Sequence, residues 1–250
     1  DINLSLGRFP VHNASSEGEL SLSPQLGRKD PSLFLLPFLC LLVYLPALQN
    51  GFVFDDFFLV VRNPYIKSWK HLPEMVTGDV WNVWEAHNYW RPIFSLSLAL
   101  DYSLWGLNPV GFHLSNIIIH TTSTLLLYSL GKKLGNSPCA VLAALLFGLH
   151  PIQAQAVNVI SIRGDLLAAL FSVLSLQAFL YKRTILFAIA LVLALLSKET
   201  SMVMPFALVF AWLIVERQKW SSALPGAFGV LAFYLVARLS LGFSFVLPRL

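Results

Sequence analysis

Two adjacent carboxylates, Asp55 and Asp56, follow the sequence Gly-Phe-Val-Phe directly after the first long apolar segment of the chain. A carboxylate among apolar side chains is suited to act as a general base, and a second one beside it strengthens that interpretation. Asp is also a favoured residue for capping a helix, so a structural role fits equally well. The pair is therefore a candidate catalytic feature, and its spacing alone leaves both interpretations open.

Further charged residues interrupt the later apolar runs: Arg163, Asp165, Lys198 and Glu199. Ionisable residues inside membrane segments are costly and usually mark functional sites. Lys198 is suited to hold a phosphate oxygen as a compact point charge, although each of these residues could also form a structural ion pair. Arg238 lies near the end of the last apolar run, where it either extends toward the membrane interface or binds an anion.

Possible metal ligands are few. His113, Asn116 and His120 have the spacing of one helix face, but a zinc site needs three or four converging ligands and no third His or Cys is near them in the sequence. We expect satisfied polar residues there and no metal site. Cys40 and Cys139 fall within or beside apolar runs, which gives no support to a disulfide framework.

The composition indicates a membrane protein. Apolar residues make up 56% of the 250 residues and charged residues only 12%, whereas soluble domains carry roughly 25% charged residues. The formal charge of +4 does not come from a basic face interleaved with aromatic residues, so we expect no nucleic-acid partner. An all-α polytopic membrane protein is the predicted fold class.

About seven apolar runs are candidate transmembrane helices: residues 32–48, 114–130, 139–149, 166–181, 184–196, 202–215 and 223–241. Several are too short to cross a bilayer core of roughly 30 Å at 1.5 Å per residue. Their helices must therefore continue through the polar residues at their ends. The clusters at 150–165 and 198–199 would then be recessed, which predicts a polar cavity below the outer surface.

The basic residues predict the topology. Short loops rich in Lys and Arg stay on the cytoplasmic side, and a cytoplasmic N-terminus places four such sites there: Arg28-Lys29, Lys132-Lys133, Lys182-Arg183 and Arg217-Gln218-Lys219. Residues 1–31 then form a mobile cytoplasmic tail and residues 32–250 the membrane domain. We treat the chain as a fragment, because it ends without a polar tail.

The long loop at 49–112 then lies outside the cytoplasm. Its Trp residues are typical of segments in the membrane interface. Residues 91–107 fit both a strand period and a helix stripe. We favour an interfacial helix, because an open strand edge near lipid would leave backbone groups unpaired.

The motifs follow one another in a specific order: Gly51-Phe52-Val53-Phe54-Asp55-Asp56, Asn63, Tyr89-Trp90-Arg91-Pro92, Asn108-Pro109, His113 to Asn116, His120, His150-Pro151-Ile152-Gln153, Arg163, Asp165-Leu166-Leu167 and Ser197-Lys198-Glu199. This series resembles the transmembrane O-mannosyltransferases that carry tetratricopeptide repeats, and their bacterial relatives, over about residues 33–240. The resemblance implies a membrane glycosyltransferase of the C-type fold with its active site at the outer surface. It also implies a polyprenyl-phosphate sugar as donor.

The resemblance assigns roles to residues. An acidic residue at the start of the first outer loop is catalytic in the family, which corresponds here to Asp55 or Asp56. We take Asp55 as the base and its neighbour as the residue that positions the acceptor. The donor phosphate is assigned to Lys198, Arg163 and Arg238, with supporting polar residues Glu199, Asp165, Arg91, His113 and His150. No cofactor is required, although a divalent metal ion could assist the phosphate.

One motif departs from the family. Family members often carry Thr-Glu in the segment after His150-Pro151, whereas this chain has Gln155 and no Glu there. This chain therefore has no carboxylate at that position.

The predicted function is transfer of mannose or another hexose from polyprenyl phosphate to a Ser or Thr hydroxyl of an extracytoplasmic protein. Alternatives are a lipid or glycan acceptor, or a non-catalytic transporter of lipid-linked sugars, which should show two related halves with broken helices. No internal repeat is visible. The bacterial inner membrane is the favoured location, and the endoplasmic reticulum is the alternative.

Overall fold

The computed structural model describes residues 30–81, 88–134, 137–215 and 223–243, and residues 31–250 form one unit. The predicted tail at 1–31 lies almost entirely outside the described residues. The regular elements in the described ranges are all helical. Their bounds are α1 Ser32–Tyr44, α2 Leu72–Thr77, α3 Pro92–Trp105, α4 Pro109–Leu134, α5 Ser137–Leu149, α6 Ala154–Asn158, α7 Arg163–Leu180, α8 Thr184–Ser197, α9 Met204–Val215 and α10 Ala223–Ser240.

Each of the seven predicted runs forms a helix. Among the described residues, three segments are long and apolar enough to cross a membrane: Ser32–Gln49, Pro109–Leu134 and Ile160–Leu180. The bent pair Ser137–Leu149 and Pro151–Asn158 gives a fourth if it forms one span. The apolar helices in the rest of the described chain are shorter, so seven complete crossings stay a prediction.

The ambiguous segment at 91–107 is helical, as predicted. Pro92 occupies the start of α3, where its fixed φ suits a helix and its missing N–H is not needed. Gly106 follows the last helical residue with a φ of 60°, which glycine adopts readily because it has no Cβ. Asn108 then caps α4, because its Oδ1 accepts a hydrogen bond from the backbone N–H of Val110 at 3.1 Å.

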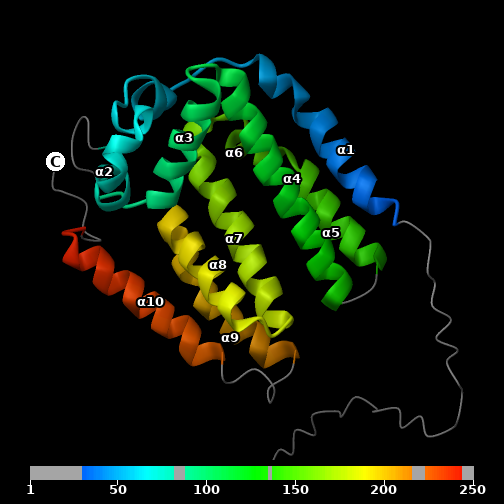
Figure 1. The fold of residues 1–250 in the computed structure, drawn as a ribbon. Coiled ribbons are helices and arrows are strands. Elements are labelled where there is room, and N and C mark those ends of the chain that lie inside the picture. The colour runs from blue at the N-terminus through cyan, green and yellow to red at the C-terminus, as the bar shows by residue number, and fades with distance from the viewer. Residues whose placement is uncertain (1–29, 82–87, 135–136, 216–222, 244–250) are drawn as a thin grey trace, which may run out of the picture. The chain divides into compact units, whose positions relative to one another are not determined.

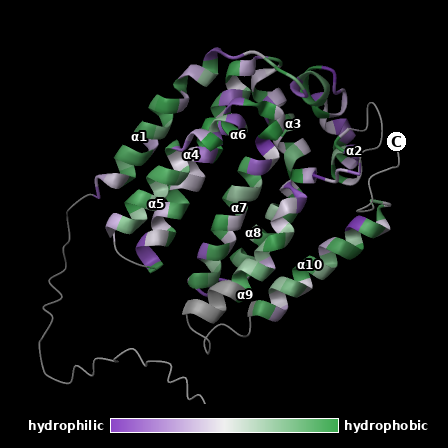
Figure 2. Ribbon diagram, turned by 180° about the vertical axis from the view of Figure 1, so that it is seen from behind, coloured by the Kyte–Doolittle hydropathy of each residue, from purple (hydrophilic) through white to green (hydrophobic). Residues whose placement is uncertain are grey.

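Helix α1 shows how the apolar surface is divided. Its buried residues are Leu36, Cys40 and Tyr44, which are four apart and so form one stripe. On other sides Phe34 and Phe38 are 67% and 60% exposed, and Figure 2 shows the hydrophobic colour along the helix. A helix that is apolar all round is typical of a membrane span.

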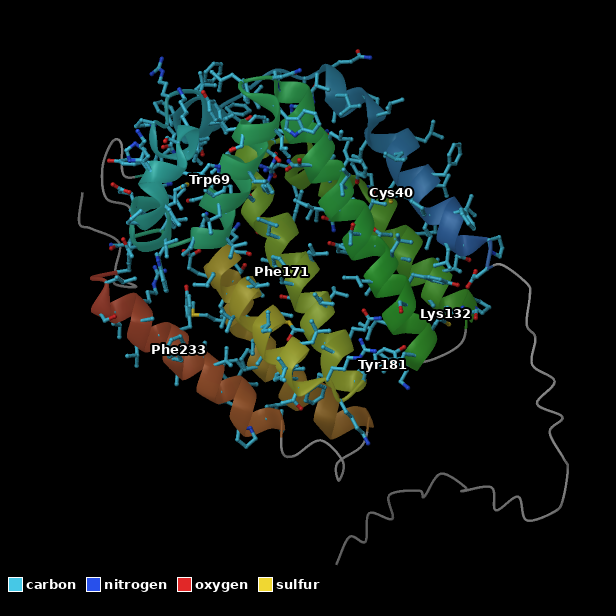
Figure 3. All side chains as sticks on the ribbon, viewed as in Figure 1. Cys40, Trp69, Lys132, Phe171, Tyr181 and Phe233 are labelled. Atoms are coloured by element: carbon cyan, nitrogen blue, oxygen red, sulfur yellow. The ribbon has the colours of Figure 1, made fainter. Side chains whose placement is uncertain are left out.

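The helices have two chemically different ends. In Figure 1, α4, α5, α7 and α8 lie side by side, while α2, α3 and α6 gather toward one end. Figure 3 places Trp69 at that end and Lys132 and Tyr181 at the other. The Nζ of Lys133 lies 5.0 Å from the ring centre of Tyr181. Tyr181 is the residue directly before Lys182-Arg183 in the sequence. Two of the predicted basic sites therefore share one end, while 28–29 and 217–219 lie outside the described residues.

Candidate active site

A polar cavity of about 350 Å³ lies at the start of α7 and the end of α8, which is the end of these helices away from Lys182-Arg183. It lies where the sequence predicts one. Helix α7 separates the two ends by 18 residues, or roughly 27 Å at 1.5 Å per residue. The charged and polar side chains that line the cavity come from five separate segments: Asp55, Arg91, Gln155, Ser161, Asp165 and Lys198.

The two carboxylates of the Asp55-Asp56 pair occupy different environments. Asp55 is exposed and lines the cavity, and in the described part of the chain its carboxylate has no hydrogen-bond or ion-pair partner. Asp56 is fully buried, and its two oxygens accept hydrogen bonds from the backbone N–H groups of Val53 at 3.0 Å and Ser161 at 2.7 Å. Asp56 thus ties the loop after α1 to the segment before α7, and Asp55 is the carboxylate of the pair that lines the cavity.

A strained turn lies between α1 and the Asp55-Asp56 pair. Phe54 has a φ of 47°, which non-glycine residues rarely adopt and which costs of order 1 to 3 kcal/mol. Its side chain is 80% exposed, so burial of the ring does not offset that cost. The hydrogen bonds of Asp56 hold the turn instead. Strained backbone of this kind clusters at functional sites.

Lys198 and Asp165 form an ion pair on the cavity wall. The Nζ of Lys198 lies 2.6 Å from both carboxylate oxygens of Asp165, and the two side chains are 24% and 40% exposed. Gly164 allows this approach, because a Cβ there would lie 3.3 Å from the carbonyl oxygen of Ser197 and 3.9 Å from the Lys198 side chain. A side chain at this position would therefore push the start of α7 away from the end of α8 by a few tenths of an ångström.

We expect Gly164→Ala to destabilise the protein by about 1 to 3 kcal/mol, because the added methyl group overpacks the contact with Ser197. Thermal unfolding of the purified protein measures the effect. Gly229→Ala in α10 is the matched control, since a Cβ there meets nothing within 4 Å and Ala favours a helix. Equal melting temperatures for the two variants would contradict the close packing at Gly164.

Glu199 is the centre of a second charged group. Its Oε2 accepts hydrogen bonds from Nε and Nη2 of Arg91 at 3.0 and 2.9 Å, and its Oε1 lies 3.5 Å from Nη1 of Arg238. Arg238 is 3% exposed and also donates to the backbone oxygen of Asn88 at 2.6 Å. Glu199 thereby joins the start of α3 to the end of α10, and Arg91 is held in place at the cavity wall.

Arg163 lies inside the protein and does not line the cavity. It is 1% exposed, and its guanidinium donates to Asn116 Oδ1 at 2.7 Å and to the backbone oxygens of Phe112 at 2.8 Å and Ser97 at 3.3 Å. The guanidinium also forms an ion pair with Asp101 Oδ2 at 2.6 Å. Burial raises the pKa of Asp101, an effect that Arg163 opposes. We call Arg163, Asp101 and Asn116 the buried Arg163 cluster, which joins α3, α4 and α7.

The predicted histidines are dispersed. His113 is fully buried on α4, while His150 is exposed and accepts a hydrogen bond from the backbone N–H of Ile152 at the turn before α6. The Nε2 of His120 lies 3.0 Å from the backbone oxygen of Gly148. None of the three lines the cavity. Within the described ranges, no three His, Cys, Asp or Glu side chains converge as metal ligands.

Sequence reasoning missed two contributors to the site. Asp101 is the only charged residue in α3, and a buried charge needs a partner, which was a signal that it pairs with a cation. Ser161 contributes through its backbone N–H to Asp56, and no side-chain pattern reveals such a contact. Gln155, in the segment after His150-Pro151, does line the cavity.

These features define a multi-pass α-helical membrane protein with a charged cavity at one end of its helices. Residues 91–240 match the family of dolichyl-phosphate-mannose-protein mannosyltransferases. The match covers more than half of the chain, and the chain belongs to this family of enzymes. The resemblance inferred from the order of the motifs is confirmed at the level of the family.

Individual relatives agree with this assignment. A protein O-mannosyl-transferase of Caenorhabditis elegans is 33% identical over 193 residues, which is 73% of this chain and 28% of the relative. One of Drosophila melanogaster is 33% identical over 72% of this chain and 23% of its own length, and one of Homo sapiens is 39% identical over 55% and 16%. The chain thus spans less than a third of these relatives. No solved structure gives a significant match.

Proposed function

We propose that the protein transfers mannose from a polyprenyl-phosphate donor to a Ser or Thr hydroxyl of a protein, with Asp55 as the general base. The observation that carries the proposal is that the exposed Asp55 carboxylate shares one cavity with the cations Lys198 and Arg91. A base and an anion-binding group on the walls of one cavity are what such a transfer requires. The family and the names of the relatives support mannose as the sugar and a protein as the acceptor.

The reaction is one displacement at the anomeric carbon of the sugar. The acceptor oxygen forms a bond to that carbon, and the bond from the carbon to the phosphate oxygen breaks. The electron pair of the broken bond leaves with the polyprenyl phosphate, and the hydroxyl proton goes to Asp55. Because a hydroxyl is a weak nucleophile at neutral pH, a positioned base contributes about 10²- to 10⁴-fold to the rate.

Lys198 is the proposed ligand of the donor phosphate, with Arg91 beside it. Both line the cavity and can stabilise the charge that grows on the leaving phosphate. Arg163 and Arg238 were assigned the same role from the sequence, but they are 1% and 3% exposed. We propose that they position the cavity walls instead, Arg163 through α7 and Arg238 through Glu199.

An apolar groove beside Arg91 and Lys198 fits the polyprenyl chain of the donor. Its volume is about 270 Å³, and it lies between α8, α10 and the segment before α3. Trp90 and Pro92 line it on either side of Arg91, and Leu195 and Leu196 line it just before Lys198. Phe233, labelled in Figure 3, belongs to its α10 wall. A lipid phosphate at Lys198 would thus have an apolar path for its chain next to its head group.

The membrane and its orientation follow from the same proposal. The N-terminus is cytoplasmic, and the cavity faces the other side, because Lys132-Lys133 and Lys182-Arg183 lie at the opposite end of the helices. The relatives named above are animal proteins. We therefore propose the endoplasmic reticulum membrane in preference to the bacterial inner membrane.

The whole protein in liposomes should transfer mannose from dolichyl-phosphate-mannose to a Ser/Thr peptide, and Lys198→Met should raise the KM for the donor about 10- to 100-fold. The reason is that hydrogen bonds to charged groups contribute roughly 1.5 to 3 kcal/mol. Product formation is measured by mass spectrometry of the peptide at several donor concentrations.

Lys133→Met is the matched control, because it removes the same charge at the end of the helices away from the cavity. It should leave the KM for the donor unchanged. Transfer to lipid or glycan acceptors in place of every peptide would contradict the protein acceptor, and an unchanged KM in Lys198→Met would contradict the phosphate site.

A further inference from the structure

The cation that the proposed function assigns to the donor phosphate already has an anionic partner. Lys198 Nζ lies at 2.6 Å from both oxygens of Asp165, so a phosphate that approaches Lys198 meets the charge of Asp165 as well. The Asp165 side chain is 40% exposed and borders the cavity. Its electrostatic effect therefore falls on whatever anion Lys198 holds.

The donor and the product of the transfer differ in charge at this position. A mannosyl polyprenyl phosphate is a phosphodiester with one negative charge. The polyprenyl phosphate left after transfer is a monoester, which carries two charges well above its second pKa of about 6. Electrostatic repulsion grows in proportion to charge, so a carboxylate beside the phosphate opposes the product about twice as strongly, in free energy, as it opposes the donor.

Asp165 also lies at the N-terminal end of a helix, which favours a negative charge. It lies in the first turn of α7, and a negative charge is favoured at a helix N-terminus by the unpaired N–H groups. The other ion pair on the cavity wall is different. Glu199 holds Arg91 with both side chains 18% exposed and is contacted by Arg238 as well, so Lys198 is the more accessible of the two cations.

We infer that Asp165 discriminates between the two forms of the lipid phosphate at Lys198, because it lowers the affinity for the dianionic product more than the affinity for the monoanionic donor. The inference rests on the proposed function, because it takes Lys198 as the phosphate ligand. It assigns Asp165 to the release of product and not to the chemical step.

The test is equilibrium binding of two lipids to the whole protein in nanodiscs at pH 8, where the monoester is a dianion. The lipids are a polyprenyl phosphate and its mannosyl phosphodiester with the same chain length. We expect Asp165→Asn to raise the affinity for the diester about tenfold and the affinity for the monoester about a hundredfold. The second factor is the square of the first because the change in binding free energy is twice as large. In steady state, kcat should fall and product inhibition should strengthen.

Two controls separate the charge of Asp165 from other effects. Asp165→Glu keeps the charge and should bind both lipids as the unmodified protein does. Glu74→Gln removes an equal charge from α2, outside the cavity lining, and should change neither affinity. Asp165→Ala repeats the test should the Asn variant fold poorly, and it should give the same order of effects.

The outcomes distinguish this inference from the proposed function. If Asp165→Asn lowers the affinity for both lipids, leaves both affinities unchanged or raises them equally, Asp165 is a structural partner of Lys198 and the inference is wrong. If Lys198→Met leaves the binding of the monoester unchanged, the phosphate site itself is misplaced. Greater tightening of the monoester than of the diester supports the discrimination.

Discussion

Asp55→Asn should lower the rate of mannose transfer by at least about two orders of magnitude while donor binding and thermal stability stay unchanged. Asn has nearly the same shape as Asp but cannot accept the proton of the acceptor hydroxyl. The carboxylate of Asp55 is exposed in the cavity, so its replacement breaks no packing. Initial rates at saturating donor and peptide measure the effect, together with a melting curve.

Asp56→Asn is the matched comparison, because the same chemical change falls on the neighbouring residue. Both oxygens of Asp56 accept backbone hydrogen bonds inside the protein, and the Asn amide nitrogen cannot accept one. We expect a loss of about 1 to 3 kcal/mol of stability there. A rate for Asp55→Asn equal to that of the unmodified protein would remove Asp55 from catalysis.

Arg163→Met should destabilise the protein by roughly 3 to 5 kcal/mol, since it leaves Asp101 buried without its cation. Thermal unfolding in detergent measures the loss. The double variant Arg163→Met with Asp101→Leu should regain part of it, because replacing both members of a buried ion pair by apolar residues is often tolerated. Arg183 has an exposed side chain, so Arg183→Met should change the free energy of unfolding by no more than about 0.5 kcal/mol.

The same experiment decides between the two roles considered for Arg163. A ligand of the donor phosphate would weaken donor binding when replaced and leave the melting temperature unchanged. A residue of the buried Arg163 cluster would lower the melting temperature first, and the double variant would recover it. Recovery of stability by Asp101→Leu cannot arise from a phosphate contact.

The sequence predicts the helices well because the membrane simplifies the problem. Long apolar runs have few alternatives to a helix in lipid, so the segments that became α4 and α7 follow from composition. At 91–107 the period was ambiguous, and backbone pairing near lipid correctly decided for the helix α3. How many helices cross the membrane depends on polar ends such as 150–165, whose depth the sequence does not give.

The site was predicted less completely, for a physical reason. Charge and position in the sequence indicate which ionisable residues matter, and they do not say which carboxylate neutralises which cation. Arg163 and Lys198 looked alike as cations at the ends of apolar runs. Partners that are distant in sequence, Asp101 for one and Asp165 for the other, make the first a buried structural residue and the second a residue of the cavity wall.

The single buried stripe on α1 has a consequence for the order in which the protein assembles. Cys40 Sγ lies 3.9 Å from the hydroxyl oxygen of Thr124, which is 84 residues later in the chain. At roughly 5 to 20 residues per second, the ribosome needs about 4 to 17 s to supply that partner. Through that interval the buried stripe of α1 lacks its partner in α4. The rest of the surface of α1 is apolar, so the helix is compatible with lipid before α4 is synthesised. Packing against α4 then buries the stripe.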